Sequence, residues 1–161
     1  MRTRVNKSVV GSIVLSILFL LSCSRGKVVF DYEPVPSGGW KASEALLLCP
    51  VIKDTLSLYD VFIEVRNDNR YPYQNLWLYV SGLQEADSIQ PPPIEILLAD
   101  EFGKWNGKGF SFVYEVSVPY LQEVQFAHSG EYPVTIRHGM TDNPLTGLKD
   151  IGLRLVKREM R

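Results

Sequence analysis

The clearest chemistry in the sequence belongs to a thiol, that of Cys23, which ends the tetrapeptide Leu20-Leu21-Ser22-Cys23. A basic N-terminus and an apolar run that begins at Val9 precede it, as in a signal peptide. The run is shorter than the roughly 20 apolar residues that cross a bilayer. A bulky residue, a small residue before the cleavage point and a thiol after it are what a bacterial lipobox requires. We therefore predict a signal peptide over residues 1–22 and lipidation at Cys23. A plain secretory signal and an uncleaved membrane anchor are the alternatives.

The sequence carries no pattern that would build a catalytic or metal site. It has no nucleophile elbow and no phosphate-binding loop, and His128 and His138 alone cannot make a zinc motif. Asp100 and Glu101 could serve as an acid–base pair, but adjacent residues on an extended chain point to opposite faces. A turn explains this pair better. We therefore predict no catalytic residue, no metal and no cofactor.

Binding chemistry is best supported in a glycine-rich loop, residues 100–109, which places a tryptophan between a lysine and an asparagine. Tryptophan and tyrosine combine a large contact area with a polar atom, so they anchor protein partners and stack on sugar rings. Packing in the core is the alternative for these aromatic residues. If the tryptophan is a contact residue, its replacement by alanine reduces partner capture and leaves thermal stability nearly unchanged. The candidate contact residues are Trp105, Lys104, Asn106, Tyr71 and Tyr73.

Composition restricts the fold further. The chain has 161 residues, 45% hydrophobic and 22% charged, which suits one globular domain and excludes a disordered chain. Three of the 17 basic residues and no acidic residue lie in the first 22, which leaves a formal charge of −4 on the rest. A nucleic-acid-binding domain would be basic. With Cys23 acylated, Cys49 has no partner for an intramolecular disulfide, and we expect it to act as a small buried hydrophobe.

Strand patterns recur along residues 28–161, which we predict to form a single domain. Short apolar or alternating segments are separated by Gly, Pro, Asn and Asp. We predict an all-β fold, a sandwich of two antiparallel sheets of the immunoglobulin-like or jelly-roll kind, with a closed barrel as the alternative. At most one helical turn is expected, over residues 119–124, and the proline-rich segment 84–93 is expected to be a surface connection. The eight expected strands are 27–33, 44–52, 56–67, 75–82, 94–100, 110–118, 131–138 and 150–157.

Some of these segments also predict which side chains face the core. Residues 60–66 alternate between apolar and charged types, as in a strand with one wet face. Residues 110–118 alternate in the same way, with Phe112 in the apolar stripe, and Trp77 is likewise expected to be buried. The spacing before Tyr132 is typical of a tyrosine corner, in which the phenol bonds back to nearby backbone.

Three groups of residues follow the lipobox in a specific order: 71–78 (YPYQNLWL), 98–109 (LADEFGKWNGKG), and 138–140 (HGM) with 145–153 (LTGLKDIGL). Together they resemble the gliding-motility lipoproteins of Bacteroidetes, the GldH family, over nearly the whole chain after the lipobox. The resemblance implies a lipoprotein associated with gliding and with the linked type IX secretion apparatus. It supplies no catalytic residue and no ligand.

We therefore expect a non-catalytic accessory or scaffold subunit of a cell-envelope machinery, held to the membrane by acyl chains such as palmitate on Cys23. Other envelope proteins are its expected partners. A glycan-binding β-sandwich module that uses the same aromatic residues is the alternative. The predicted tether, residues 23–27, lacks the acidic run that surface lipoproteins of Bacteroidetes often carry there, and Ser24 follows the cysteine. These features favour the outer membrane, with the domain facing the periplasm.

Overall fold

The computed structural model describes residues 28–83 and 92–158, and its regular structure consists of β-strands. The predicted signal peptide and tether, and most of the proline-rich segment 84–93, lie outside the described residues. Within those residues no helix is long and apolar enough to cross a membrane. The eleven strands of the described chain are β1 (Val28–Pro34), β2 (Leu46–Leu48), β3 (Val51–Ile52), β4 (Tyr59–Asp68), β5 (Asn75–Ser81), β6 (Ile94–Leu97), β7 (Lys108–Phe110), β8 (Val113–Val124), β9 (Gly130–Glu131), β10 (Val134–His138) and β11 (Leu148–Lys157).

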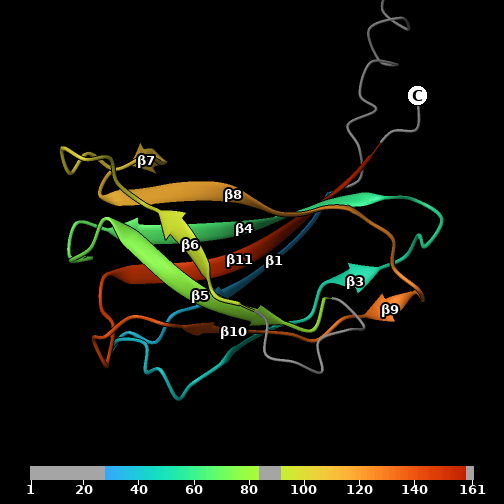
Figure 1. The fold of residues 1–161 in the computed structure, drawn as a ribbon, viewed down its shortest axis with the longest axis horizontal. Coiled ribbons are helices and arrows are strands. Elements are labelled where there is room, and N and C mark those ends of the chain that lie inside the picture. Colours follow the sequence, from blue (N-terminus) through green and yellow to red (C-terminus); the bar gives the residue numbers. More distant parts are fainter. Residues whose placement is uncertain (1–27, 84–91, 159–161) are drawn as a thin grey trace, which may run out of the picture.

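The strands form two antiparallel sheets that pack on each other, with a small third sheet at one end (Figure 1). The larger sheet has the order β1-β11-β4-β8-β7 and the smaller one β2-β10-β5-β6, while β3 pairs with β9. Side chains from both large sheets form one hydrophobic core. The predicted all-β antiparallel sandwich is confirmed.

The central strands of the five-stranded sheet show why alternation produces this fold. Val61, Ile63 and Val65 of β4 are fully buried, as their alternation predicts. Across the strand pair, Ile63 lies opposite Leu153 and Val65 opposite Ile151, both also fully buried. Each strand therefore turns one continuous apolar stripe toward the other sheet, and burial of such surface contributes roughly 25 cal/mol per Å².

The outer face of this sheet is built around one buried carboxylate, that of Glu64, whose side chain is 2% exposed. It accepts hydrogen bonds from Arg154 Nε at 2.6 Å and from Ser117 Oγ at 2.8 Å. Arg154 also donates to Ser117 Oγ at 2.8 Å, and its guanidinium carbon lies 4.0 Å from the centre of the Phe62 ring. The arginine is essential here, because a buried carboxylate without its cation is strongly destabilising.

Three of the eight expected strands are each divided in two, which gives eleven. The expected strand 44–52 breaks at Pro50, and 131–138 breaks at Pro133, because proline has no N–H to donate to a ladder. The expected strand 110–118 breaks at Ser111, whose φ of 62° makes the turn between β7 and β8.

The helical turn predicted for residues 119–124 is wrong, since they continue β8. Leu121 lies opposite Val61, so pairing with β4 holds the segment extended. Glu123, with a φ of 57°, is the one residue of the segment recorded in the left-handed region, and its N–H donates to an Asp60 carboxylate oxygen at 3.1 Å. Pairing across the sheet has outweighed local propensity.

Two residues predicted for the core lie elsewhere. Phe112 is 70% exposed, because the turn at Ser111 separates it from the ladder that begins one residue later. Trp77 is half-buried on the outer face of the four-stranded sheet, since its neighbours Leu76 and Leu78 occupy the inner face. A shift of one residue exchanges the two faces of a strand.

Tyr132 makes the hydrogen bond that the tyrosine-corner spacing predicts. Its hydroxyl donates to the carbonyl oxygen of His128 at 2.9 Å and accepts from the His128 N–H at 3.1 Å. The phenol ring also stacks on the imidazole, with ring centres 4.8 Å apart. These contacts fix the turn that leads from β8 into β9.

Two connections that cross between the large sheets are bonded to each other. Residues 35–45 lead from β1 to β2, and residues 139–147 lead from β10 to β11. The backbone N–H of Trp40 donates to the Leu145 oxygen at 2.8 Å, and the Leu145 N–H donates to the Trp40 oxygen at 2.7 Å. The fully buried indole of Trp40 donates to the Glu44 carbonyl oxygen at 2.8 Å, so its polar atom is satisfied.

His138 joins β10 to this crossing. Its Nε2 contacts the Trp40 carbonyl oxygen at 3.0 Å, and its Nδ1 accepts from the Met140 N–H at 3.3 Å. These partners assign the proton to Nε2 and leave the imidazole neutral with both nitrogens satisfied. Burial lowers the pKa of His138 from its ordinary 6.5.

We expect His138 to make the fold less stable in weak acid. Because its folded pKa lies below 6.5, the unfolded chain takes up the proton first. Its contribution is complete above that pH and is lost as the pH falls, with a slope of at most about 1.4 kcal/mol per pH unit. Urea unfolding between about pH 7.5 and pH 5 measures this slope. His138→Gln removes the contribution and the exposed control His128→Gln retains it, whereas a slope that disappears in the His128 variant contradicts the assignment.

Candidate functional site

The candidate residues gather at one end of the sandwich, which we call the Trp105 end. There β4 finishes and β8 begins, with Asp68 opposite Val113. The opposite end, which we call the entry end, holds the start of β1, where Val28 lies opposite Val156. Since β4 has ten residues, the two ends are separated by about 30 Å.

The loop between β6 and β7 folds as a small hairpin, and Trp105 lies at its base. Ala99 and Trp105 form an isolated antiparallel bridge, and the Asp100 N–H donates to the Lys104 oxygen at 2.9 Å. Phe102 is therefore the tip residue, and it is 87% exposed. The sequence indicated a tryptophan as the contact residue of this loop, but the aromatic side chain that it presents to solvent is the phenylalanine.

Asp100 determines this arrangement. Its Oδ1 accepts from the Phe102 N–H at 3.0 Å and from the Lys104 N–H at 2.9 Å. An aspartate that bonds to the backbone two residues ahead forms an Asx turn. The geometry agrees with the interpretation of Asp100 and Glu101 as turn residues.

Trp105 is half-buried and packs on neighbouring aromatic rings. Its ring centre lies 6.5 Å from that of Tyr71 and 5.8 Å from that of Tyr114, and Tyr71 lies 6.0 Å from Tyr73. Its indole Nε1 donates to Asn69 Oδ1 at 3.0 Å. Three of the five candidates, Trp105, Tyr71 and Tyr73, thus form one cluster. For Trp105, this geometry is as consistent with packing inside the domain as with contact to a partner.

The other two candidates flank this cluster on the surface. Asn106 donates its backbone N–H to the Leu98 oxygen at 2.8 Å and its Nδ2 to the Leu97 oxygen at 3.2 Å, which fixes the hairpin on the edge strand β6. Lys104 is exposed beside Phe102. Asn106 is thus a positioning residue, while Lys104 remains available to a partner.

The turn after β4 holds the aromatic cluster in place. The Asp68 carboxylate accepts from the Arg70 N–H at 2.9 Å and from Arg70 Nη2 at 2.8 Å, and Lys149 Nζ lies 3.0 Å away. Burial raises the pKa of Asp68, but the hydrogen bonds from Arg70 and Lys149 outweigh it and hold the pKa at about 2. Gly147, with a φ of +84°, permits the close approach, because a Cβ there would lie 2.2 Å from the Tyr71 nitrogen.

The two tyrosines are occupied by hydrogen bonds. Buried Tyr71 donates its hydroxyl to the Asn75 oxygen at 2.8 Å, and burial raises its pKa. A hydrogen bond to Asp142 raises the pKa of Tyr73. Both phenols are therefore protonated at neutral pH, and neither can act as a general base.

The exposed apolar surface at this end comes from residues that the sequence pattern did not select. Phe102 and Phe112 stand on two neighbouring tight turns, and Leu97, on the edge strand β6, is 60% exposed. The signal for Phe102 was the aspartate two residues before it and the glycine after it, since together these place an aromatic side chain at the centre of a turn.

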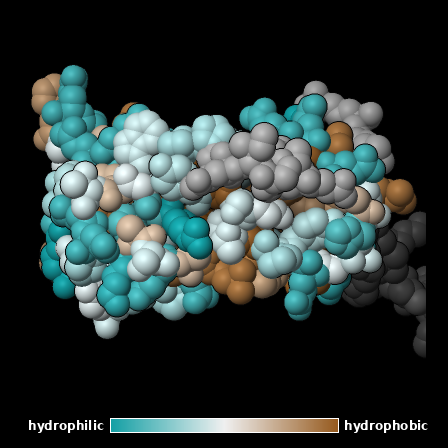
Figure 2. Space-filling model, turned by 60° about the horizontal axis from the view of Figure 1, so that its bottom comes forward, coloured by the Kyte–Doolittle hydropathy of each residue, from teal (hydrophilic) through white to brown (hydrophobic). Residues whose placement is uncertain are grey.

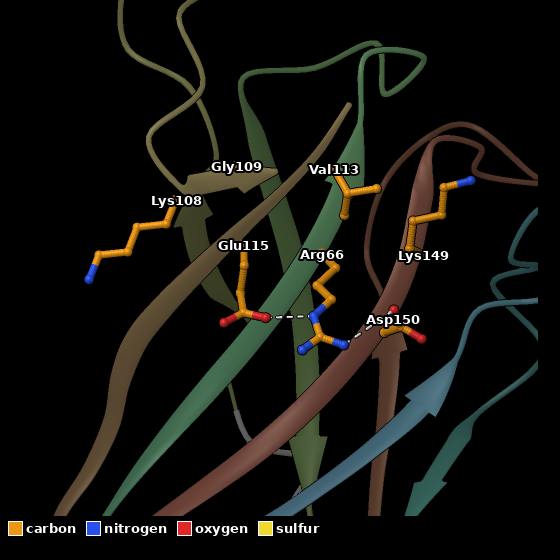
Figure 3. A pocket seen from close by; sticks show the side chains of 7 residues that line it. All are labelled: Arg66, Lys108, Gly109, Val113, Glu115, Lys149 and Asp150. Carbon is orange, nitrogen blue, oxygen red and sulfur yellow. Dashed lines mark hydrogen bonds and ion pairs between the residues drawn. The ribbon is translucent and has the colours of Figure 1, made fainter. Parts of the chain in front are cut away.

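A hollow of about 660 Å³ lies beside this end, on the outer face of the five-stranded sheet. Arg66 lies at its centre, with Nε 2.5 Å from a Glu115 oxygen and Nη1 3.8 Å from an Asp150 oxygen, and Figure 3 shows the two lysines of the rim pointing away from it. The arginine is balanced by the two carboxylates, and the lining has no histidine, serine or cysteine. Among the described residues, moreover, no cluster of His, Cys, Asp and Glu could hold a metal. The lining residues are Arg66, Lys108, Gly109, Val113, Glu115, Lys149 and Asp150.

Comparison with known proteins places these features in a family. The sequence profile of the GldH lipoproteins matches residues 27–155. The chain belongs to the GldH lipoprotein family. Among its relatives is the gliding motility lipoprotein GldH of Flavobacterium johnsoniae, 28% identical over 156 residues that cover 92% of this chain and 96% of that protein. Another is a gliding motility lipoprotein GldH homolog of Christiangramia forsetii, 29% identical over 153 residues that cover 91% of this chain and 93% of the relative.

The GldH family resemblance predicted from sequence is thus confirmed, and the fragments that carried it contact each other in the fold. Residues 71–78 supply Tyr71, residues 98–109 supply Trp105, and residues 145–153 supply Gly147. The Tyr71 ring contacts Trp105 on one side, and its backbone approaches Gly147 on the other. In this GldH-family domain, the most recognisable part of the sequence builds the Trp105 end.

We expect the indole hydrogen bond to stabilise the Trp105 end. Trp105→Phe and Asn69→Ala should each cost about 1 kcal/mol of unfolding free energy, and the double variant should cost little more than either, because both remove the same bond. Trp105→Ala should cost about 2 kcal/mol through lost packing. Chemical denaturation measures all four variants. The control Phe102→Ala should be nearly neutral, and fully additive single effects would contradict the pairing.

Proposed function

We propose that this member of the GldH family is a lipid-anchored, non-catalytic subunit of the envelope machinery of gliding motility and the linked type IX secretion apparatus. Its Trp105 end would bind a partner protein. The observation that carries the proposal is the pair of exposed phenylalanines, Phe102 and Phe112, held on hydrogen-bonded or strained turns at the end opposite the start of β1. Three observations support the proposal, namely membership of the GldH family, the lipobox at Cys23 and the exposed apolar surface of the Trp105 end.

The lipid anchor is supported by the sequence. Cys23 follows the lipobox pattern and precedes the start of β1 by five residues. The absence of acidic residues in the tether and the presence of Ser24 favour the outer membrane with the domain in the periplasm. In that arrangement the Trp105 end faces away from the membrane, where a partner protein can reach it.

A protein partner fits the Trp105 end better than a glycan does. The most exposed rings at this end are phenylalanines, which have no polar atom to bond a sugar hydroxyl, whereas the Trp105 indole N–H is already engaged by Asn69. Aromatic side chains such as those of Phe102 and Phe112 are enriched in protein contact surfaces, and an exposed charge such as Lys104 suits the polar rim around them. Glycan binding therefore stays the alternative outcome of the test.

We expect Cys23→Ser to abolish the anchor. Serine cannot form the thioether, so metabolic labelling with an alkyne analogue of palmitate should lose its signal, and the protein should leave the outer-membrane fraction. Cys49→Ser is the matched control and should be labelled as the unmodified chain is. Acylation that persists in the Cys23 variant would contradict the lipobox assignment.

Partner binding is tested by placing a photo-cross-linking amino acid at Phe102 in living cells. A discrete envelope protein should be captured from this position, since its side chain is 87% exposed at the Trp105 end. Leu47, 54% exposed on β2, is the control position. Capture should fall several-fold with Lys104→Glu while the fold stays intact. Retention of polysaccharide with no protein captured at Phe102 would favour the glycan-binding alternative.

A further inference from the structure

Exposed leucines stand on the loop that connects β3 to β4, residues 53–58, at the entry end. Leu56 is 83% exposed and Leu58 is 37% exposed, and Val28 at the start of β1 is 40% exposed. The loop lies at the right of Figure 1, and Figure 2 shows hydrophobic side chains at that edge of the molecule. Apolar side chains exposed this far on one loop point to a contact.

The loop presents these leucines on a fixed frame. The Asp54 carboxylate accepts from the Leu56 N–H at 3.0 Å, from Ser57 Oγ at 3.0 Å and from Lys157 Nζ at 2.5 Å. The Tyr59 hydroxyl donates to the Asp54 carbonyl oxygen at 2.9 Å. Leu56 is therefore held outward by hydrogen bonds and does not simply lack a place in the core.

The register places this loop beside the point where the chain enters the domain. β1 and β4 flank β11 on its two sides, so they lie about 10 Å apart. Val28 lies opposite Val156, and two residues further on, just past the end of β11, the Arg158 N–H donates to the Leu58 oxygen at 2.8 Å. From Cys23 to Val28 the chain spans at most about 17 Å. A lipid on Cys23 would thus hold this end close to the membrane.

Charged side chains at the entry end form ion pairs with one another, which leaves its exposed apolar side chains as the main contact groups. Lys157 is paired with Asp54, and Arg158 is paired with both Asp60 and Glu123. The Lys157 pair is neutral and Arg158 with its two carboxylates carries one net negative charge, so an anionic partner gains little from these groups. A hydrocarbon surface fits better than a charged one.

We propose that Leu56, Leu58 and Val28 dip into the surface of the lipid bilayer that holds the Cys23 lipid. The inference rests on the proposed lipid anchor and adds a second contact to it. Because apolar side chains at an interface gain from leaving water, the two contacts together fix the tilt of the domain. The Trp105 end then stands about 30 Å from the membrane surface.

The test uses the lipidated protein in vesicles of phosphatidylethanolamine and phosphatidylglycerol. In a Cys49→Ala background, Leu56→Cys offers one thiol for an environment-sensitive dye, because the Cys23 thiol is blocked by lipid. Leu97→Cys, on exposed β6 at the Trp105 end, is the matched control. We expect the dye at position 56 to shift to the blue and to lose half or more of its emission with brominated lipids. The dye at position 97 should report water.

Each other outcome overturns a defined part of the proposal. Protein that fails to float with the vesicles overturns the anchor and the loop contact together. Protein that floats while the dye at position 56 reports water overturns the loop contact and leaves the anchor. A blue-shifted dye that brominated lipid does not quench shows that a second copy of this chain covers the loop, and overturns the lipid contact. Quenching at both positions shows that the domain lies flat and overturns the proposed tilt.

Discussion

The arrangement of the two sheets depends on Trp40, where the two connections that cross between them are bonded to each other. Its backbone pairs with Leu145 in both directions, its indole fills the core, and its carbonyl oxygen meets His138 from the neighbouring strand. Because these bonds join residues about a hundred positions apart, the contact closes the fold over most of its length. In a sandwich without disulfides among its described residues, this buried ring with its satisfied polar atoms adds a closing contact to the core that both sheets share.

The same logic of satisfied polar groups extends to the Trp105 end. Asp68 organises the turn after β4, Gly147 lets the next connection approach it, and the turn then offers Asn69 to the indole of Trp105. Asp100 holds the neighbouring hairpin through two backbone hydrogen bonds. Two short acidic turns thus convert flexible loop sequence into a rigid platform, and a rigid platform loses less entropy when it binds.

Much of this could be predicted from the sequence where a local pattern determines the structure. The alternation of Val61, Ile63 and Val65 was enough to assign a core-facing strand, because alternate residues of a strand point to the same face of the sheet. The loop tip was harder, since whether Trp105 or Phe102 faces solvent depends on which backbone groups Asp100 bonds. The helical turn predicted for residues 119–124 was wrong for a different reason. These residues are held extended by pairing with β4, a strand remote in sequence. The prediction for Phe112 was wrong because the turn at Ser111 takes this residue out of the ladder, whereas Val116 of the same predicted stripe is buried.

The strand order has a mechanical consequence. If the domain is anchored where β1 begins and is held by a partner at the Trp105 end, tension runs parallel to the strands. β1 pairs with β11 along all seven of its residues, from Val28 opposite Val156 to Pro34 opposite Asp150. Hydrogen bonds in an antiparallel pair stand across the strands, so such a load must shear them together and cannot open them one after another. The edge strand β1 would then resist tension by shear, a useful property if the domain links a bilayer to a partner that moves.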